Sequence, residues 1–151
     1  YGIGSFVYRA RLPFHPQRLY EFLIAGWRHG NLVRSKGYFW LASRLDQVGS
    51  WSQAGGIMNH GFAGLFWAAV PREHWPDHQD HVDSIEAKFE SPWGDRRQEI
   101  VFIGQGLDRD QACRDLNACL LTDREVAAGP DKWKQLPDPF PQWIQETKED
   151  A

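Results

Sequence analysis

Three histidines lie close together in one acidic segment, and they are the side chains of this sequence best suited to metal chemistry. His78 and His81 are three residues apart on a predicted helix, so their side chains can share a face. His74 precedes that helix in a loop that could fold back toward it, and Asp77 lies between them. Imidazole nitrogens with a carboxylate or a water suit Zn²⁺. The segment predicts either a zinc site or, as the alternative, the polar face of a helix beside a turn.

A second group of candidates is cationic and flanks two predicted buried strands. An Arg-Ser-Lys-Gly run beside Tyr38 and Trp40 is typical of an interface rim, where charged and aromatic side chains mix. The alternative is that these charges are solvated strand ends. We predict a docking or anion-binding edge made of Arg34, Lys36, Tyr38, Asp95, Arg96 and Arg97.

The sequence carries no recognisable catalytic motif. A phosphate-binding loop needs spaced glycines followed by Lys and a Ser or Thr, and the nearest run, residues 34–37, lacks this arrangement. There is no nucleophile elbow, no zinc-protease helix motif and no pair of Cys-x-x-Cys motifs. We therefore predict a domain that is not an enzyme by itself and binds no cofactor tightly, apart from the Zn²⁺ that the histidines would hold.

Charge and hydropathy argue against two further classes of function. The net charge of −3 provides no broad basic field for nucleic acid. No apolar run reaches the ~18–20 residues that a membrane span needs. Cys113 and Cys119 are separated by roughly 9 Å along a predicted helix, which is too far for a disulfide. We expect a cytoplasmic protein without nucleic-acid or membrane partners.

Hydrophobic periodicity predicts a mixture of strands and helices. Strands are expected over 2–11, 37–42, 51–54, 64–70 and 98–104, and helices over 16–27, 76–90 and 109–121. Glycines between the short middle strands favour hairpins over crossovers. The pattern predicts an α+β fold with a mostly antiparallel sheet of about four to five strands, helices packed on one face, and an extended Pro- and Trp-rich C-terminal tail lying across the body.

Several motifs in series resemble the C-terminal domain of CobW-type proteins. They are GIGSFVYRARLPF at 2–14, RSKG at 34–37 leading into FWLA at 39–42, WSQAGG at 51–56, GDRRQEIVFIG at 94–104, ACLLTD at 118–123 and LPDPFP at 136–141. Together they cover nearly the whole chain in the expected order. The resemblance implies that residues 1–144 form a CobW C-terminal-like domain, that 145–151 are a frayed tail, and that an N-terminal GTPase domain is absent from this chain.

The resemblance also implies a role. CobW-type proteins are P-loop GTPases that act as metallochaperones or metal-insertion factors, for zinc or for cobalt in cobalamin synthesis. Their GTP, Mg²⁺ and cysteine-rich metal motifs belong to the N-terminal domain. The resemblance implies that this chain is a regulatory and client-docking domain, with its own GTPase domain and a client metalloprotein as partners. The alternative is a zinc-binding or zinc-sensing module that uses His74, His78 and His81.

Overall fold

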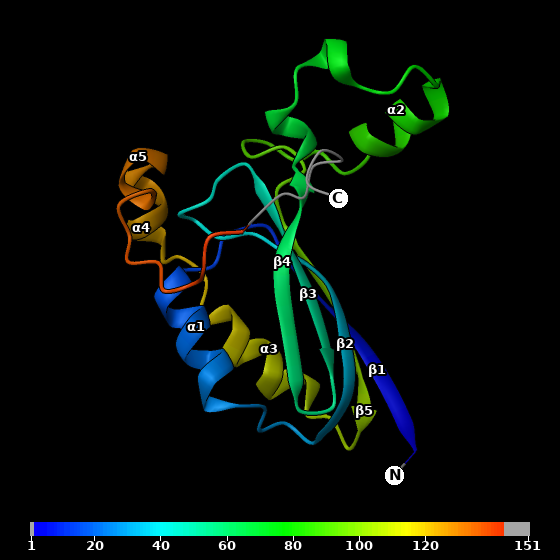
Figure 1. The fold of residues 1–151 in the computed structure, drawn as a ribbon, viewed down its shortest axis with the longest axis vertical. Helices are drawn as coiled ribbons and strands as arrows, with labels where there is room; N and C mark the ends of the chain where they lie inside the picture. The colour runs from blue at the N-terminus through cyan, green and yellow to red at the C-terminus, as the bar shows by residue number, and fades with distance from the viewer. Residues whose placement is uncertain (1, 144–151) are drawn as a thin grey trace.

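The structure, a computed structural model, describes residues 2–143, and within that range the chain forms an antiparallel sheet of five strands in the order β1-β5-β2-β3-β4 (Figure 1). The strands are β1 (Ile3–Ala10), β2 (Asn31–Phe39), β3 (Gln47–Ala54), β4 (Ile57–Leu65) and β5 (Gln98–Gln105). The helices are α1 (Pro16–Ala25), α2 (Gln79–Glu86), α3 (Arg109–Asn117), α4 (Asp123–Ala128) and α5 (Pro130–Trp133), with 3-10 turns at Trp67–Ala69 and Arg72–His74.

One face of the sheet is buried, and α1 and α3 lie side by side against it (Figure 1). Ile100 and Phe102 point from β5 into this core and are fully buried. Leu19 of α1 and Leu116 of α3 belong to the same apolar cluster. Successive strand residues point to opposite faces, so Val101, which lies between Ile100 and Phe102, points away from the helices. The predicted α+β fold, with an antiparallel sheet and helices on one face, is confirmed.

The side-chain amide of Gln98 joins three stretches of backbone where the strands leave the sheet. It is fully buried. Its Oε1 accepts the Trp40 N–H at 2.5 Å, and its Nε2 donates to the carbonyls of Leu12 at 2.8 Å and Trp40 at 3.1 Å. Trp40 directly follows β2 and Leu12 follows β1, so one amide satisfies groups that the strand ladders leave unpaired.

The middle of the chain differs from the sequence prediction. The strand predicted over 37–42 is β2, which ends at Phe39, and the strand predicted over 64–70 is β4, which ends at Leu65. A hairpin turns at Gly55, whose φ of 57° suits glycine, so the strand lies earlier than its apolar run suggested. The helix predicted over 76–90 is the shorter α2, preceded by 3-10 turns.

The C-terminal part contains more helix than predicted. The Pro- and Trp-rich tail was predicted to be extended, but Pro130 stands in the first turn of α5, where its missing N–H costs nothing. α4 precedes it, opened by a capping box between Thr122 and Glu125. Trp133 and Phe140 are buried, so the prediction that this segment packs across the body is confirmed. The predicted fraying after residue 144 lies outside the described residues.

No helix within residues 2–143 is long and apolar enough to cross a membrane.

We expect Gln98→Ala to lower the free energy of unfolding by about 2 kcal/mol or more, because the Trp40 N–H and the Leu12 carbonyl lose this partner. The Trp40 carbonyl keeps the N–H of Phe14. Urea denaturation followed by tryptophan fluorescence measures this. Gln105→Ala at the exposed end of the same strand is the matched control. A Gln98→Ala variant as stable as that control would contradict the role assigned to this amide.

An ion pair between Arg18 and Glu125 links α1 to α4. The Arg18 guanidinium lies 2.5 Å from one carboxylate oxygen and 3.3 Å from the other. The hydrogen bond from Arg18 lowers the pKa of Glu125 to about 2, assisted by the backbone N–H of Thr122.

This lowered pKa makes part of the stability dependent on pH. The group ionises in the folded state at about 2 but near its usual value of 4.5 when unfolded, so its contribution is complete above pH ~4.5 and is lost as the pH falls toward 2. Because the pair is partly exposed, we expect wild type to lose about 1 kcal/mol more than Glu125→Gln between pH 5 and pH 2. Urea midpoints at several pH values test this, and parallel curves for the two proteins would contradict it.

Candidate functional site

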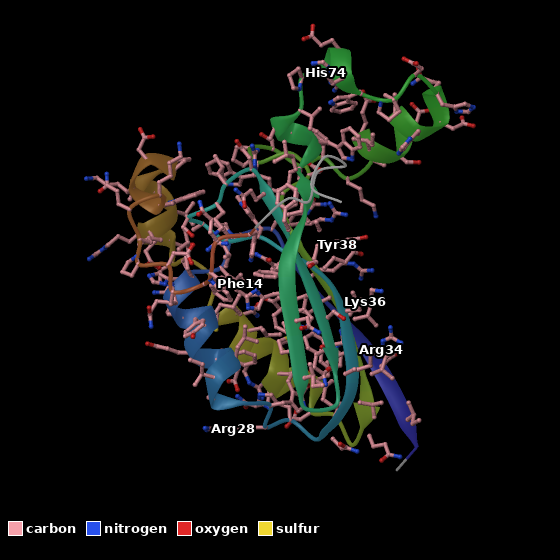
Figure 2. All side chains as sticks on the ribbon, in the orientation of Figure 1. Phe14, Arg28, Arg34, Lys36, Tyr38 and His74 are labelled. Atoms are coloured by element: carbon pink, nitrogen blue, oxygen red, sulfur yellow. The ribbon has the colours of Figure 1, made fainter. Side chains whose placement is uncertain are left out.

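The face of the sheet opposite α1 and α3 is open, and the charged and aromatic residues predicted on β2 lie on it. Figure 2 shows Arg34, Lys36 and Tyr38 in a row along β2, pointing away from the helices. Ser35 and Phe39 on the same strand are buried on the other face, as the alternation requires. We refer to this side of the sheet as the open face.

The strand register places a mixed set of neighbours around these three side chains. β2 is the middle strand, and each residue from Arg34 to Tyr38 has a partner on β5 and another on β3. Along β2, Tyr38 lies opposite Glu99 and Ser50, Lys36 opposite Val101 and Ser52, and Arg34 opposite Ile103 and Ala54. Tyr38 is 47% exposed and Val101 is 37% exposed. An exposed aromatic and apolar strip between cations has the composition of a protein interface.

Gly37, which follows Lys36 in β2, lies too close to β5 to carry a side chain. A Cβ at this position would lie 2.0 Å from the carbonyl oxygen of Glu99 and 2.7 Å from Cα of Ile100, both on β5. Any larger residue would push the two central strands apart. This glycine therefore serves the close approach of β2 and β5, and with it the position of Lys36 and Tyr38 on the open face.

The other predicted docking residues do not share one surface with these three. Asp95 is buried and accepts the N–H groups of Trp67 and Ala68, both at 2.9 Å. Arg96 donates to backbone carbonyls, including that of Leu45, and pairs with Asp46 at 2.7 Å. These two side chains hold the segment between β4 and β5 against the body.

Arg97, the last of the six, reaches the border of the open face. It donates to the carbonyl of Asp95 at 2.8 Å and lies 3.3 Å from the carboxylate of Glu99. Glu99 also pairs with Arg9 of β1 at 3.2 Å. Sequence reasoning missed Arg9 because its neighbourhood depends on the pairing of β1 with β5. The available signal was the alternation in β1, where buried Phe6 and Tyr8 direct Arg9 outward.

The structure does not bring the predicted metal ligands into one group. His74 lies in a 3-10 turn with its side chain 69% exposed, near Glu73 (Figure 2). His78 precedes the first residue of α2, and the ring of His81, within α2, packs edge-on against Trp67. Asp77 is exposed in the preceding loop. Within residues 2–143, no three His, Cys, Asp or Glu side chains are placed to hold a metal ion together.

The described residues thus form an α+β domain whose sheet has one face packed against helices and one open, partly cationic face. The profile described as "Cobalamin synthesis protein cobW C-terminal domain" matches residues 3–120. The chain belongs to this family.

Its relatives include proteins named for zinc. The chain is 39% identical over 145 residues to the zinc-regulated GTPase metalloprotein activator 1 of Dictyostelium discoideum, covering 93% of this chain and 30% of the relative. It is 35% identical over 144 residues to a zinc chaperone of Mycobacterium tuberculosis, covering 90% and 34%. The chain therefore spans about a third of the length of these relatives.

Among solved structures, the Zn(II)-bound YjiA GTPase from E. coli has a similar fold, with a TM-score of 0.53 and 13% sequence identity. The match covers 79% of this chain and 30% of that one. At this identity the likeness concerns the fold alone.

We expect titration with Zn²⁺ to show no one-to-one binding at His74, His78 and His81, because the described residues place no three ligands together there. Calorimetric titration with Zn²⁺ checks this, with the double variant His78→Ala/His81→Ala as the control. Binding at one equivalent that disappears in the double variant would contradict the prediction and support the zinc-module hypothesis.

Proposed function

We propose that this chain is the regulatory and client-docking domain of a GTP-dependent metallochaperone for zinc, and that it is not catalytic by itself. The single observation that carries the proposal is the open face, where Arg34, Lys36 and Tyr38 stand uncovered on the central strand. The names of two relatives support zinc and GTP as the metal and the nucleotide of the longer protein. The family description makes cobalt in cobalamin synthesis the alternative cargo.

The physical argument is that the sheet presents a face that the domain does not need for its own folding. The large aromatic residues Phe39, Trp51 and Phe102 point to the opposite face and contact one another there. The open face leaves Tyr38 and Val101 partly exposed, so a partner that covers them would gain apolar contact area. Five adjacent strands make a surface broad enough for a protein partner.

We infer two partners for this face in a cytoplasmic protein: its own GTPase domain, which would hold GTP and Mg²⁺, and a client metalloprotein. For the domain to regulate, it must bind one of them with different affinity in the two nucleotide states, since equal binding shifts no equilibrium. Arg34 and Lys36 supply charge and Tyr38 supplies apolar area for such a difference. Arg97 extends the cationic side of the face, while Asp95 and Arg96 support it from within.

The double variant Arg34→Glu/Lys36→Glu in the full-length protein tests this function. Reversing two interfacial charges should weaken the association with a client by about tenfold or more, and change the GTP hydrolysis rate measured with the client present. The stability of the domain should stay within about 0.5 kcal/mol of wild type, because both side chains are exposed.

The matched control is Lys132→Glu/Lys134→Glu, which reverses two exposed charges at α5, away from the open face. Client affinity and GTPase rate should match wild type in this control. If the two double variants behave alike, the open face is not the docking surface.

A further inference from the structure

A cationic hollow lies at one end of the open face, where Arg9, Arg97 and Glu99 are joined by Arg11 and Lys88. It has a volume of about 280 Å³. Its charged lining comes from the end of β1, the start of β5 and the residues after α2: Arg9, Arg11, Lys88, Arg97 and Glu99. Three segments far apart in sequence thus place four cations and one carboxylate around one small space.

The hydrogen bonds of the hollow leave donors free. Glu99 is shared between two guanidinium groups, with Arg9 at 3.2 Å and Arg97 at 3.3 Å. Arg11 donates from Nη1 to the carbonyls of Lys88 and Gly94 and pairs through Nε with Glu90 at 2.9 Å, and the Glu90 side chain is 62% exposed. Lys88 forms no ion pair with the carboxylates of the described residues.

Positive charge therefore dominates in this space. Partial burial alone would raise the pKa of Glu99, but the hydrogen bond from Arg9 and the charges of Arg97 and Lys88 hold it below its usual value. The carboxylate of Asp95 is nearby but is committed to two backbone N–H groups. An added anion would meet three guanidinium groups and an ammonium group, an arrangement that binds carboxylates and phosphates.

The hollow continues the charged row of the open face. Arg9 pairs with Glu99 across β1 and β5, and Glu99 pairs with Tyr38 across β5 and β2. Within the strands of the described residues, the ionised side chains are three cations, Arg9, Arg34 and Lys36, and the carboxylate Glu99. The carboxylates of the chain, whose net charge is −3, are concentrated elsewhere, with Asp80, Asp83 and Glu86 on α2, Asp110 and Asp115 on α3, and Asp123 and Glu125 on α4.

We propose that the hollow formed by Arg9, Arg11, Lys88 and Arg97 binds a side-chain carboxylate from an acidic segment of the protein that docks on the open face. The inference rests on the proposed function and specifies the chemistry of the partner. A protein segment fits better than a free anion, because Glu99 of the hollow lies opposite Tyr38 and two residues from Val101 on the same face, and a segment could cover both of these partly exposed side chains. Electrostatic complementarity of this kind sets the register and speeds association.

An acidic peptide titrated into the chain locates the site. The probe is a peptide of alternating Glu and Ser, and the control peptide has Gln in place of every Glu. Two-dimensional NMR should show amide shifts at residues 9–11, 88 and 97–99 with the acidic peptide and none with the Gln peptide. Binding should weaken as salt is added, because the partners are charges.

The variant Arg9→Gln/Lys88→Gln removes two cations but keeps the Arg97–Glu99 pair and the backbone bonds of Arg11. It should weaken peptide binding by about three- to tenfold, as expected for losing two partly exposed ion pairs. The matched control Lys132→Gln/Lys134→Gln removes the same charge from α5 and should bind like wild type. Equal affinities of the two variants, or shifts that avoid the hollow, would overturn the proposal.

Inorganic phosphate distinguishes a protein segment from a free anion. If phosphate displaces the peptide at equal concentration, the hollow is a small-anion site and the proposal is wrong. If Arg34→Glu/Lys36→Glu has no effect on client binding but the peptide still binds at the hollow, the proposed function is wrong and the anion site remains. A functional effect of Arg34→Glu/Lys36→Glu without peptide shifts at the hollow keeps the docking face and removes this inference.

Discussion

The buried amide of Gln98 is the interaction on which the arrangement of this domain depends. Its three hydrogen bonds hold Leu12 and Trp40 at the points where β1 and β2 leave the sheet. From there the chain passes Phe14, which is fully buried and whose N–H donates to the Trp40 carbonyl at 2.9 Å, into α1. With Gln98 directed inward, Glu99 must point outward and Ile100 inward. One buried polar residue therefore fixes which residues of β5 face the core and which lie on the open face.

The separation of the two faces also separates stability from binding. The inner face holds stacked aromatics such as Phe6 on Phe102 and Trp27 on Phe102, with ring centroids 5.0 and 5.2 Å apart. Such contacts and the apolar area behind them dominate the folding free energy. The open face contributes exposed charges, which are each worth a few tenths to about 1 kcal/mol. Residues there can change to suit a partner at little cost to the fold.

Much of the fold could be predicted because local patterns agree with it. β5 and α3 lie nearly where the ranges 98–104 and 109–121 were predicted, because apolar residues alternate along β5 and Asp108 caps the start of α3. The ends of β2 and β4 were predicted wrongly because Trp40, Phe66 and Trp67 continue the apolar runs past the strands. These side chains pack in the tertiary structure beyond the strand ends. Arg34, Lys36 and Tyr38 were found as a group because one strand carries them. Arg9 was missed because the register of β1 on β5 decides which charges it meets. Lys88 was missed, and Asp95 and Arg96 were wrongly assigned to the docking edge, because the positions of these charges depend on the fold of the segment before β5.

Under the proposed function, the strength of the charges on the open face suits a regulated interface better than a permanent one. Several partly exposed ion pairs together supply about 2–3 kcal/mol, which is the range of typical coupling energies between sites. If one nucleotide state withdraws the acidic partner segment, that amount changes the affinity by about 30- to 150-fold, since each 1.4 kcal/mol is a factor of ten. A wholly apolar face would bind more tightly but would respond less to the movement of a few charges. The mixture on this sheet, with Tyr38 and Val101 between the cations, combines enough apolar area for contact with enough charge for release.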